Sequence, residues 1–260
     1  MIEQPARSGH RKIIVEKPLA LDLAGLARIA RARRRWGLDI TVAAHRLHSE
    51  LTHRLLRSRD EGGFGRLRRI HVVQSKPRFT RSAAVPGHPT AFDIEMPHAP
   101  PAVLALASDA AVAGASLTDT VTDRLRPPRL GRARLRLTPY SGVHTRIESD
   151  LTAPVRERRI TLHFDQATVV GHYPCSDADD TARLRITTRD RRRTRSVFSD
   201  DALFTFIHDA YGRYARREAA DDLLAVHVAT VRLLAEAKSL GTAHEPVLAP
   251  EETGHAHRVR

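Results

Sequence analysis

The sequence has little of several residue types, and each shortage excludes a class of structure. Its 260 residues include one cysteine, Cys175, which excludes an internal disulfide and a cysteine-based zinc site. No apolar run approaches the roughly 20 residues that a membrane-spanning helix needs. The N-terminus does not have the pattern of a secretory signal peptide. With 41% hydrophobic residues, the composition predicts a folded cytoplasmic protein.

Lysine and aromatic residues are also scarce, although the formal net charge is +13. Only four of the 43 basic residues are lysines, and the arginines occur in nearly every segment, most densely at 28–36 and 189–196. Aromatic side chains, which stack on nucleic-acid bases, make up 5% of the residues. This distribution favours solvated arginine surfaces. Nucleic-acid binding is a weaker alternative, which would show a steep loss of affinity with added salt.

A strand, a helix and a second strand are predicted near the N-terminus. Residues 13–15 form a short apolar strand, and Pro18 ends it. Asp22 is the expected N-cap of a helix that stops at Gly37, and residues 39–45 form the second strand. This order predicts a βαβ unit with parallel strands and a right-handed crossover. Two parallel strands cannot bury both of their faces alone, so the unit needs further strands beside it.

The rest of the chain predicts an antiparallel sheet with flanking helices. A strand is expected at 66–79, and several segments of alternating or β-branched character lie between 114 and 198. Because these segments follow one another without intervening helices, they indicate an antiparallel meander. A helix is expected to begin near Pro100, since proline is tolerated in a first turn. The other helices are expected at 48–60, about 200–216 and 218–239.

Three regions are predicted from these patterns. Residues 1–46 contain the βαβ unit, and their first ten residues are expected to be loose. Residues 47–240 form an α+β region with the antiparallel sheet and its helices. Residues 241–260, rich in histidine, proline and glutamate, are expected to be a disordered tail.

These landmarks, in this order, resemble the Gfo/Idh/MocA family of NAD(P)-dependent oxidoreductases over roughly residues 11 to 240. The most specific element is the Glu16-Lys17-Pro18 corner between strand and helix. The resemblance implies an α/β plus α+β fold, in which a parallel Rossmann half is followed by an open-faced, mainly antiparallel sheet with flanking helices. Four later segments carry the rest of the likeness: 55–73, 92–107, 200–214 and 221–241.

One part of the family pattern has no counterpart in the sequence. The first half of the Rossmann domain, with its glycine-rich phosphate loop, is on the order of a hundred residues. Residues 62–65 cannot replace that loop, because they follow a helix and precede a strand, so they are predicted to be a turn. The missing strands are expected upstream of a wrongly assigned start, or in a partner chain. The implied cofactor is NAD or NADP, and the absent loop puts its binding in doubt.

Oxidation of a secondary alcohol needs a base near the hydroxyl and a cation that favours the developing alkoxide. By resemblance, Lys17 orients the substrate and shares the proton, and Pro18 and Glu16 belong to the corner that borders the nicotinamide. Lys17 also stands at the carboxyl end of its strand, where ligands of α/β sheets bind. The alternative is a surface lysine paired with Glu16.

His98 is the candidate general acid and base, because imidazole titrates near neutrality. The alternative is a histidine that caps the following helix. The family carries an aspartate four residues before its histidine, whereas Asp93 lies five residues and Glu95 three residues before His98, so both are candidates. His45 and Arg46 fall where the family lines its cofactor cleft. The sequence gives no metal site.

Two functions follow from the sequence. The first is an oxidoreductase that transfers hydride between NAD(P) and a sugar, cyclitol or similar polyhydroxylated substrate, with an incomplete cofactor site in this chain. The alternative is a non-catalytic remnant that acts as an interaction or assembly subunit. The resemblance also implies a homo-oligomer that forms through the open sheet, because broad open sheets need covering.

Overall fold

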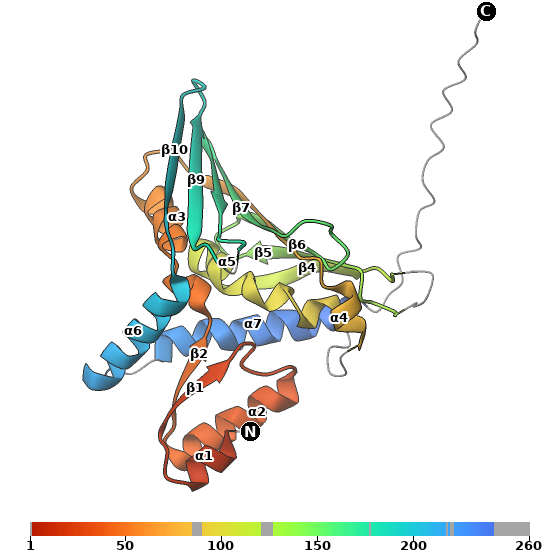
Figure 1. The fold of residues 1–260 in the computed structure, drawn as a ribbon, viewed down its shortest axis with the longest axis vertical. Helices are drawn as coiled ribbons and strands as arrows, with labels where there is room; N and C mark the ends of the chain where they lie inside the picture. The colour runs from red at the N-terminus through yellow and green to blue at the C-terminus, as the bar shows by residue number, and fades with distance from the viewer. Residues whose placement is uncertain are drawn as a thin grey trace, which may run out of the picture.

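The computed structural model describes residues 2–84, 90–120, 127–176, 178–216, 218 and 221–241. These residues form a small parallel unit and a large sheet covered by helices on one face (Figure 1). None of the helices within the described ranges is long and apolar enough to cross a membrane. The expected disordered tail lies outside the described residues, apart from Gly241.

The small unit is the predicted βαβ arrangement. Strands β1 (Lys12–Glu16) and β2 (Asp39–Ala43) pair in parallel, and α2 (Leu23–Trp36) connects them. Asp22 accepts a hydrogen bond from the Gly25 N–H at 2.6 Å, and Gly37 ends the helix with a φ of 58°. The prediction of a loose start is wrong, because residues Glu3–Arg7 form α1, whose Ala6 is fully buried in the core of this unit.

The large sheet has eight strands in the order β10-β9-β8-β7-β3-β6-β5-β4. Its mainly antiparallel pairing is as predicted. The strands do not form the predicted simple meander, because β3 lies between β7 and β6 and is parallel to β6. Ile70 and Val72 of β3 are almost completely buried, which a central position provides. The strands are β3 (Leu67–Ser75), β4 (Ala110–Leu117), β5 (Arg132–Pro139), β6 (His144–Asp150), β7 (Glu157–Phe164), β8 (Ala167–His172), β9 (Thr181–Thr188) and β10 (Arg193–Ser199).

The predicted strand at 66–79 was too long. It ends at Ser75, and after Pro77 the chain forms a short helix, α4 (Phe79–Ala84). The remaining helices agree with the expected positions to within a few residues. They are α3 (Glu50–Asp60), α5 (Pro100–Ala107), α6 (Ala202–Arg216) and α7 (Asp221–Leu240), with short 3-10 turns η1 (His45–His48), η2 (Ala91–Asp93) and η3 (Met96–His98).

Helix α7 joins the two parts of the molecule. It runs between the large sheet and the parallel unit, in contact with β4, α5, α2 and β2 (Figure 1). Leu224 and Val231 pack into the core of the parallel unit, whereas Leu233 and Ala237 pack into the core beneath the sheet. Because one rigid helix contributes to both cores, the carboxyl end of β1 is held in a fixed place beside the sheet domain.

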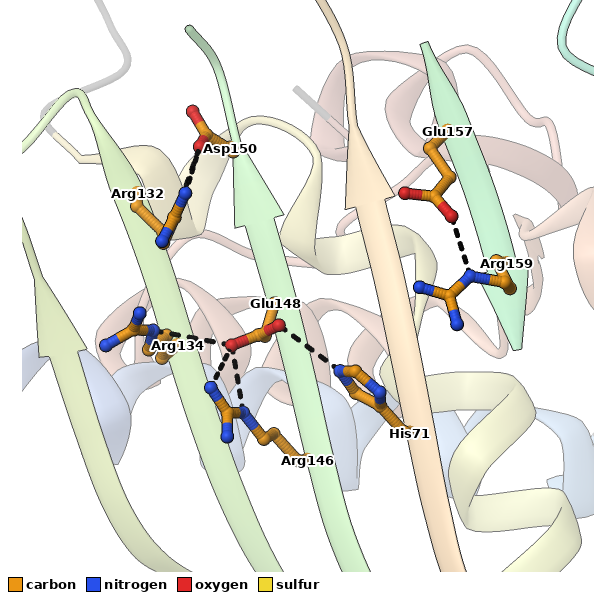
Figure 2. Close-up of polar contacts among 8 residues, drawn as sticks. All are labelled: His71, Arg132, Arg134, Arg146, Glu148, Asp150, Glu157 and Arg159. Carbon is orange, nitrogen blue, oxygen red and sulfur yellow. Dashed lines mark hydrogen bonds and ion pairs between the residues drawn. The ribbon is translucent and has the colours of Figure 1, made fainter. Parts of the chain in front are cut away.

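The second face of the large sheet is not covered by helices. Along β5, arginines alternate with the buried residues Ala133, Leu135 and Leu137, as the two-residue period of a strand requires. Figure 2 shows the charged side chains of this uncovered face, with the helices lying behind the strands. The polar site described next lies on the other, helix-covered side.

Candidate functional site

Lys17 lies directly after β1, at the carboxyl end of the strand. The peptide bond between Lys17 and Pro18 is cis, and the Lys17 N–H donates to the carboxylate of Glu16 at 2.8 Å. Burial lowers the pKa of the Lys17 amine. The carboxylates of Glu16 and Glu95 oppose this effect, and the charge of Arg46 adds to it. The carboxylates that act on the amine are therefore not limited to Glu16.

Two histidines from separate segments meet near this lysine. The rings of His45, in η1, and His98, in η3, have centroids 5.8 Å apart and meet edge to face. Burial, followed by the charge of Arg46, lowers the pKa of His98 well below its ordinary value, and Lys17 contributes to the same shift. The same three causes, with Arg158, lower the pKa of His45 to about 4. Both imidazoles are therefore neutral at pH 7.

A chain of buried polar groups extends from Arg46 to Glu95. Arg46 donates to the side-chain oxygen of Gln74, and the Gln74 amide donates to Glu95 at 2.8 Å. The guanidinium of Arg46 also lies over the ring of Tyr173, 4.8 Å from its centroid. Although burial lowers the pKa of Arg46 to about 10, the side chain is still a cation at pH 7. A second arginine, Arg78, approaches Glu95 to 3.6 Å.

The structure separates the two candidate carboxylates. Asp93 accepts hydrogen bonds from the backbone and hydroxyl of Thr90 at 3.1 and 2.7 Å, and Lys238 donates to it at 2.9 Å. These contacts cap the η2 turn and tie it to α7. Glu95 instead lies with Lys17 and Arg46. Burial raises the pKa of Glu95, but the hydrogen bond from Gln74 and the nearby cations outweigh that effect, so the pKa is lowered.

A pocket of about 520 Å³ opens beside His45 and Arg46. Arg158 and Tyr173 complete this wall, and Tyr173 shares a 2.9 Å hydrogen bond with Thr52. The sequence analysis missed Arg158, Tyr173 and Gln74, because each lies within a strand or at its end and only the pairing of distant strands brings it here. Four aspartates also line the pocket: Asp179, Asp180, Asp200 and Asp201.

The N-termini of four described helices, α2, α3, α5 and α6, do not fit the pyrophosphate of a dinucleotide. A carboxylate already accepts from the first-turn N–H groups of α2, α3 and α6, namely Asp22, Asp200 and Asp201 respectively. Helix α5 begins with two prolines, which have no N–H to offer. A G-x-G-x-x-G pattern is absent from the sequence, and residues 62–65 lie between α3 and β3 as the predicted turn.

The other conspicuous histidines do not form a metal site. His48 pairs with Asp209, their nearest atoms being 2.8 Å apart, and its ring meets Phe206 edge to face. Within the described ranges, no three side chains of histidine, cysteine, aspartate or glutamate gather closely enough to hold a metal ion.

Comparison with solved structures identifies the fold. The chain is similar to KijD10, a 3-ketoreductase from Actinomadura kijaniata in complex with TDP-benzene and NADP, with a TM-score of 0.76 at 18% identity. The likeness covers 92% of this chain and 72% of that one. A second neighbour is the UDP-N-acetylglucosamine 3-dehydrogenase GnnA from Acidithiobacillus ferrooxidans, with a TM-score of 0.67, 19% identity and coverage of 93% and 73%.

A third neighbour is an oxidoreductase from Agrobacterium radiobacter in complex with NAD+, L-tartaric acid and magnesium, with a TM-score of 0.73 at 13% identity and coverage of 93% and 74%. No family model and no curated protein matches the sequence. At these identities the likeness establishes the fold, which is the mixed α/β fold of these oxidoreductases.

Proposed function

We propose that this chain is a Gfo/Idh/MocA-type oxidoreductase subunit, whose substrate is a sugar, cyclitol or related polyhydroxylated molecule. The observation that carries the proposal is the contact between the rings of His45 and His98 beside a pocket of about 520 Å³ that His45 lines, with Lys17 near enough to contribute to the lowered pKa of both imidazoles. Two neighbours of the same fold support it, one a 3-ketoreductase in complex with TDP-benzene and NADP and the other a UDP-N-acetylglucosamine 3-dehydrogenase. In this proposal, residues 1–46 belong to the cofactor-binding unit and residues 47–240 to the substrate domain.

The two central residues have complementary tasks in proton transfer. Neutral His98 accepts the hydroxyl proton when the alcohol is oxidised and returns it to the oxygen in the reverse reaction. The ammonium of Lys17 lies where it stabilises the alkoxide, and its lowered pKa also suits it to relay the proton. Glu95 and Arg46 act through these groups, because they fix the local charge and do not handle the proton themselves.

The hydride chemistry of such an enzyme belongs to a nicotinamide nucleotide. Glu16, Pro18, His45 and Arg46 are the residues of this chain that would border the nicotinamide end. The pyrophosphate does not fit the N-termini of α2, α3, α5 and α6, so we propose that its binding groups lie elsewhere. We therefore assign to this chain only the recognition of the substrate and the proton transfer at its oxygen.

A second candidate function follows from that misfit. A protein with the sheet domain and without a phosphate loop acts as a binding or assembly subunit, with the uncovered sheet face as its contact surface. The observation that favours it is the carboxylate at the first turn of three helices, since such a carboxylate repels a phosphate group. In both candidates we propose a homo-oligomer that forms through the uncovered face.

Titration with NADH and NADPH, followed by nicotinamide fluorescence, separates the two candidates. Saturable binding below millimolar concentration supports the oxidoreductase, and we expect Lys17→Met to weaken it. Lys12→Met is the matched control, because Lys12 lies on the same strand but is exposed, donating to the Tyr214 carbonyl at 2.6 Å. No binding up to millimolar cofactor contradicts an enzymatic role for this chain alone and favours the assembly subunit.

A further inference from the structure

We propose that the pocket beside His45 binds an anionic group of the substrate through Arg158, so that the substrate is a polyhydroxylated acid. The anionic group is a carboxylate or a phosphate, both of which match the planar fork of a guanidinium. This inference rests on the proposed function for the identity of the reaction, but the binding itself requires no catalysis.

The position of Arg158 is the first step. In the pairing of β7 with β3, Arg158 lies directly opposite Gln74, which is buried on the helix-covered side. Directly opposite residues of two antiparallel strands share a face, so Arg158 points toward the pocket and its neighbour Arg159 points to the uncovered face. Figure 2 shows Arg159 on that uncovered face, in contact with Glu157.

The donors of Arg158 are only partly satisfied. Its Nη1 donates to the carbonyl of Pro174 at 2.9 Å. Its Nε is buried, and no hydrogen-bond acceptor in the described part of the chain reaches it. The described residues therefore leave this guanidinium incompletely paired, and because Arg158 lines the pocket, an anion bound there pairs with its charge. Arg46 stands on the same wall and adds a second guanidinium.

The lining of the pocket carries both signs of charge. Arg46 and Arg158 line it together with four aspartates. Glu95, which faces Arg78, already accepts from Gln74. The two guanidinium groups are therefore the part of the lining where an anionic group of a ligand pairs, while the rest of the ligand meets carboxylates.

The aspartates of the lining select for hydroxyl groups. Asp200 accepts from the Ser49 hydroxyl at 2.6 Å and from the Glu50 N–H at 2.8 Å, so it is held rigidly. The other three aspartates of the lining likewise accept from adjacent hydroxyl or N–H groups. An ionised carboxylate has about four lone-pair sites, and its free ones accept hydrogen bonds from ligand hydroxyls. The pocket therefore fits a ligand with an anionic end and a hydroxylated end.

Isothermal calorimetry with small probes, without nicotinamide, tests the proposal. The probes are D-glucuronate, D-glucose 6-phosphate, neutral D-glucose and succinate, which has carboxylates but no hydroxyls. We expect one of the two anionic sugars to bind at least about tenfold more tightly than glucose and than succinate. Glucose lacks the anionic group, and succinate lacks the hydroxyl groups. The comparison of glucuronate with glucose 6-phosphate separates a carboxylate from a phosphate ligand.

Variants of two adjacent arginines complete the experiment. Arg158→Gln is expected to weaken the anionic sugar about tenfold to a hundredfold, and Arg158→Lys by less, since it keeps the charge but loses the fork. Arg159→Gln is the matched control and leaves binding unchanged, because its side chain lies on the uncovered face. Circular dichroism and thermal unfolding verify that each variant is folded.

Three outcomes overturn the inference: glucose binds as tightly as the acids, Arg158→Gln has no larger effect than Arg159→Gln, or neither anionic sugar binds at millimolar concentration. These outcomes do not depend on the cofactor titration. If an acid binds as expected while NADH and NADPH do not, the anionic subsite holds and the oxidoreductase role of this chain alone fails. If the cofactors bind and no acid does, the oxidoreductase role is supported and the anionic subsite fails.

Discussion

The two faces of the large sheet carry charge in opposite ways. On the helix-covered side, Glu95 is 2% exposed and joined through Gln74 to the buried Arg46. On the uncovered face, Glu148 contacts Arg146, Arg134 and His71 in a cluster of comparable size, with side chains that stay partly exposed (Figure 2). The chemistry of the side chains is similar, so the difference between the faces is one of solvation.

This difference decides what each cluster can do. Water screens the uncovered charges and lowers their mutual energy to a small value. Side chains of the same types lie on the covered side, enclosed between η1, η3 and the sheet. There they shift one another's pKa values, as seen for Lys17, His45 and His98. A perturbed cluster beside a pocket is suited to chemistry or to ligand binding, whereas the uncovered cluster is suited to solubility or assembly.

The largest effect is expected from Glu95→Gln. This change removes the carboxylate shared by the buried cations and leaves Arg46 and Arg78 without it, so we expect a loss of about 4 kcal/mol in the free energy of unfolding. Denaturation in urea, at pH 7, measures the loss. A cost below about 1 kcal/mol would mean that the enclosed charges are as well solvated as the uncovered ones.

The next effect concerns pH and a buried imidazole. His227 of α7 is 5% exposed, and burial, with a contribution from His48, lowers its pKa to about 4. An unfolded histidine binds a proton below about pH 6.5, so the unfolded state binds more protons between pH 6.5 and 4. The contribution of neutral His227 to the free energy of unfolding is therefore complete above pH 6.5 and is lost as the pH falls. At about pH 4 the loss amounts to about 3 kcal/mol.

Replacement of this imidazole tests the assignment. His227→Gln should flatten the fall in unfolding free energy between pH 6.5 and 4, while His144→Gln, on the uncovered face, should leave the slope as it is in the parent protein. Urea denaturation at a series of pH values measures the slope. Equal slopes for His227→Gln and the parent protein would show that His227 is solvated in the folded state.

Local signals in the sequence predicted the parallel unit well. Asp22 and Gly37 mark the two ends of α2 by capping, which depends only on neighbouring residues. The Glu-Lys-Pro corner and His98 were also chosen from local sequence, and Lys17 contributes to the lowered pKa of His98, while their catalytic roles stay a prediction. These signals depend only on residues that are close together in the sequence, so they can be recognised without knowledge of the tertiary contacts.

The remaining features depend on contacts between distant segments. The insertion of β3 between β6 and β7, and the position of Arg158 opposite Gln74, follow from strand register, which no local pattern encodes. The spacing rule also failed to choose between Asp93 and Glu95. These residues flank two short 3-10 turns, whose geometry differs from that of an α-helix, so the side-chain directions could not be counted from His98.

A prediction of intermediate size separates those two carboxylates. Asp93→Asn weakens the contact with Lys238 and part of the cap on η2, and we expect it to cost about 2 kcal/mol of unfolding free energy. A double-mutant cycle with Lys238→Met isolates the pair. Binding of the anionic sugar should be unchanged in Asp93→Asn, and a parallel loss of binding would place Asp93 in the site after all.

The smallest effect is expected from Glu148→Gln on the uncovered face, the counterpart of Glu95→Gln. Glu148 is one-fifth exposed and its arginine partners about half exposed, so salt and water screen the cluster, and we expect a loss below about 1 kcal/mol. Because the Debye length falls from about 30 Å at 0.01 M salt to about 3 Å at 1 M, this loss should shrink further at high salt. The loss for Glu95→Gln should persist there, since screening ions do not enter the covered side. Equal salt sensitivity of the two variants would remove the distinction between the faces, and with it the reason to place ligand binding on one of them.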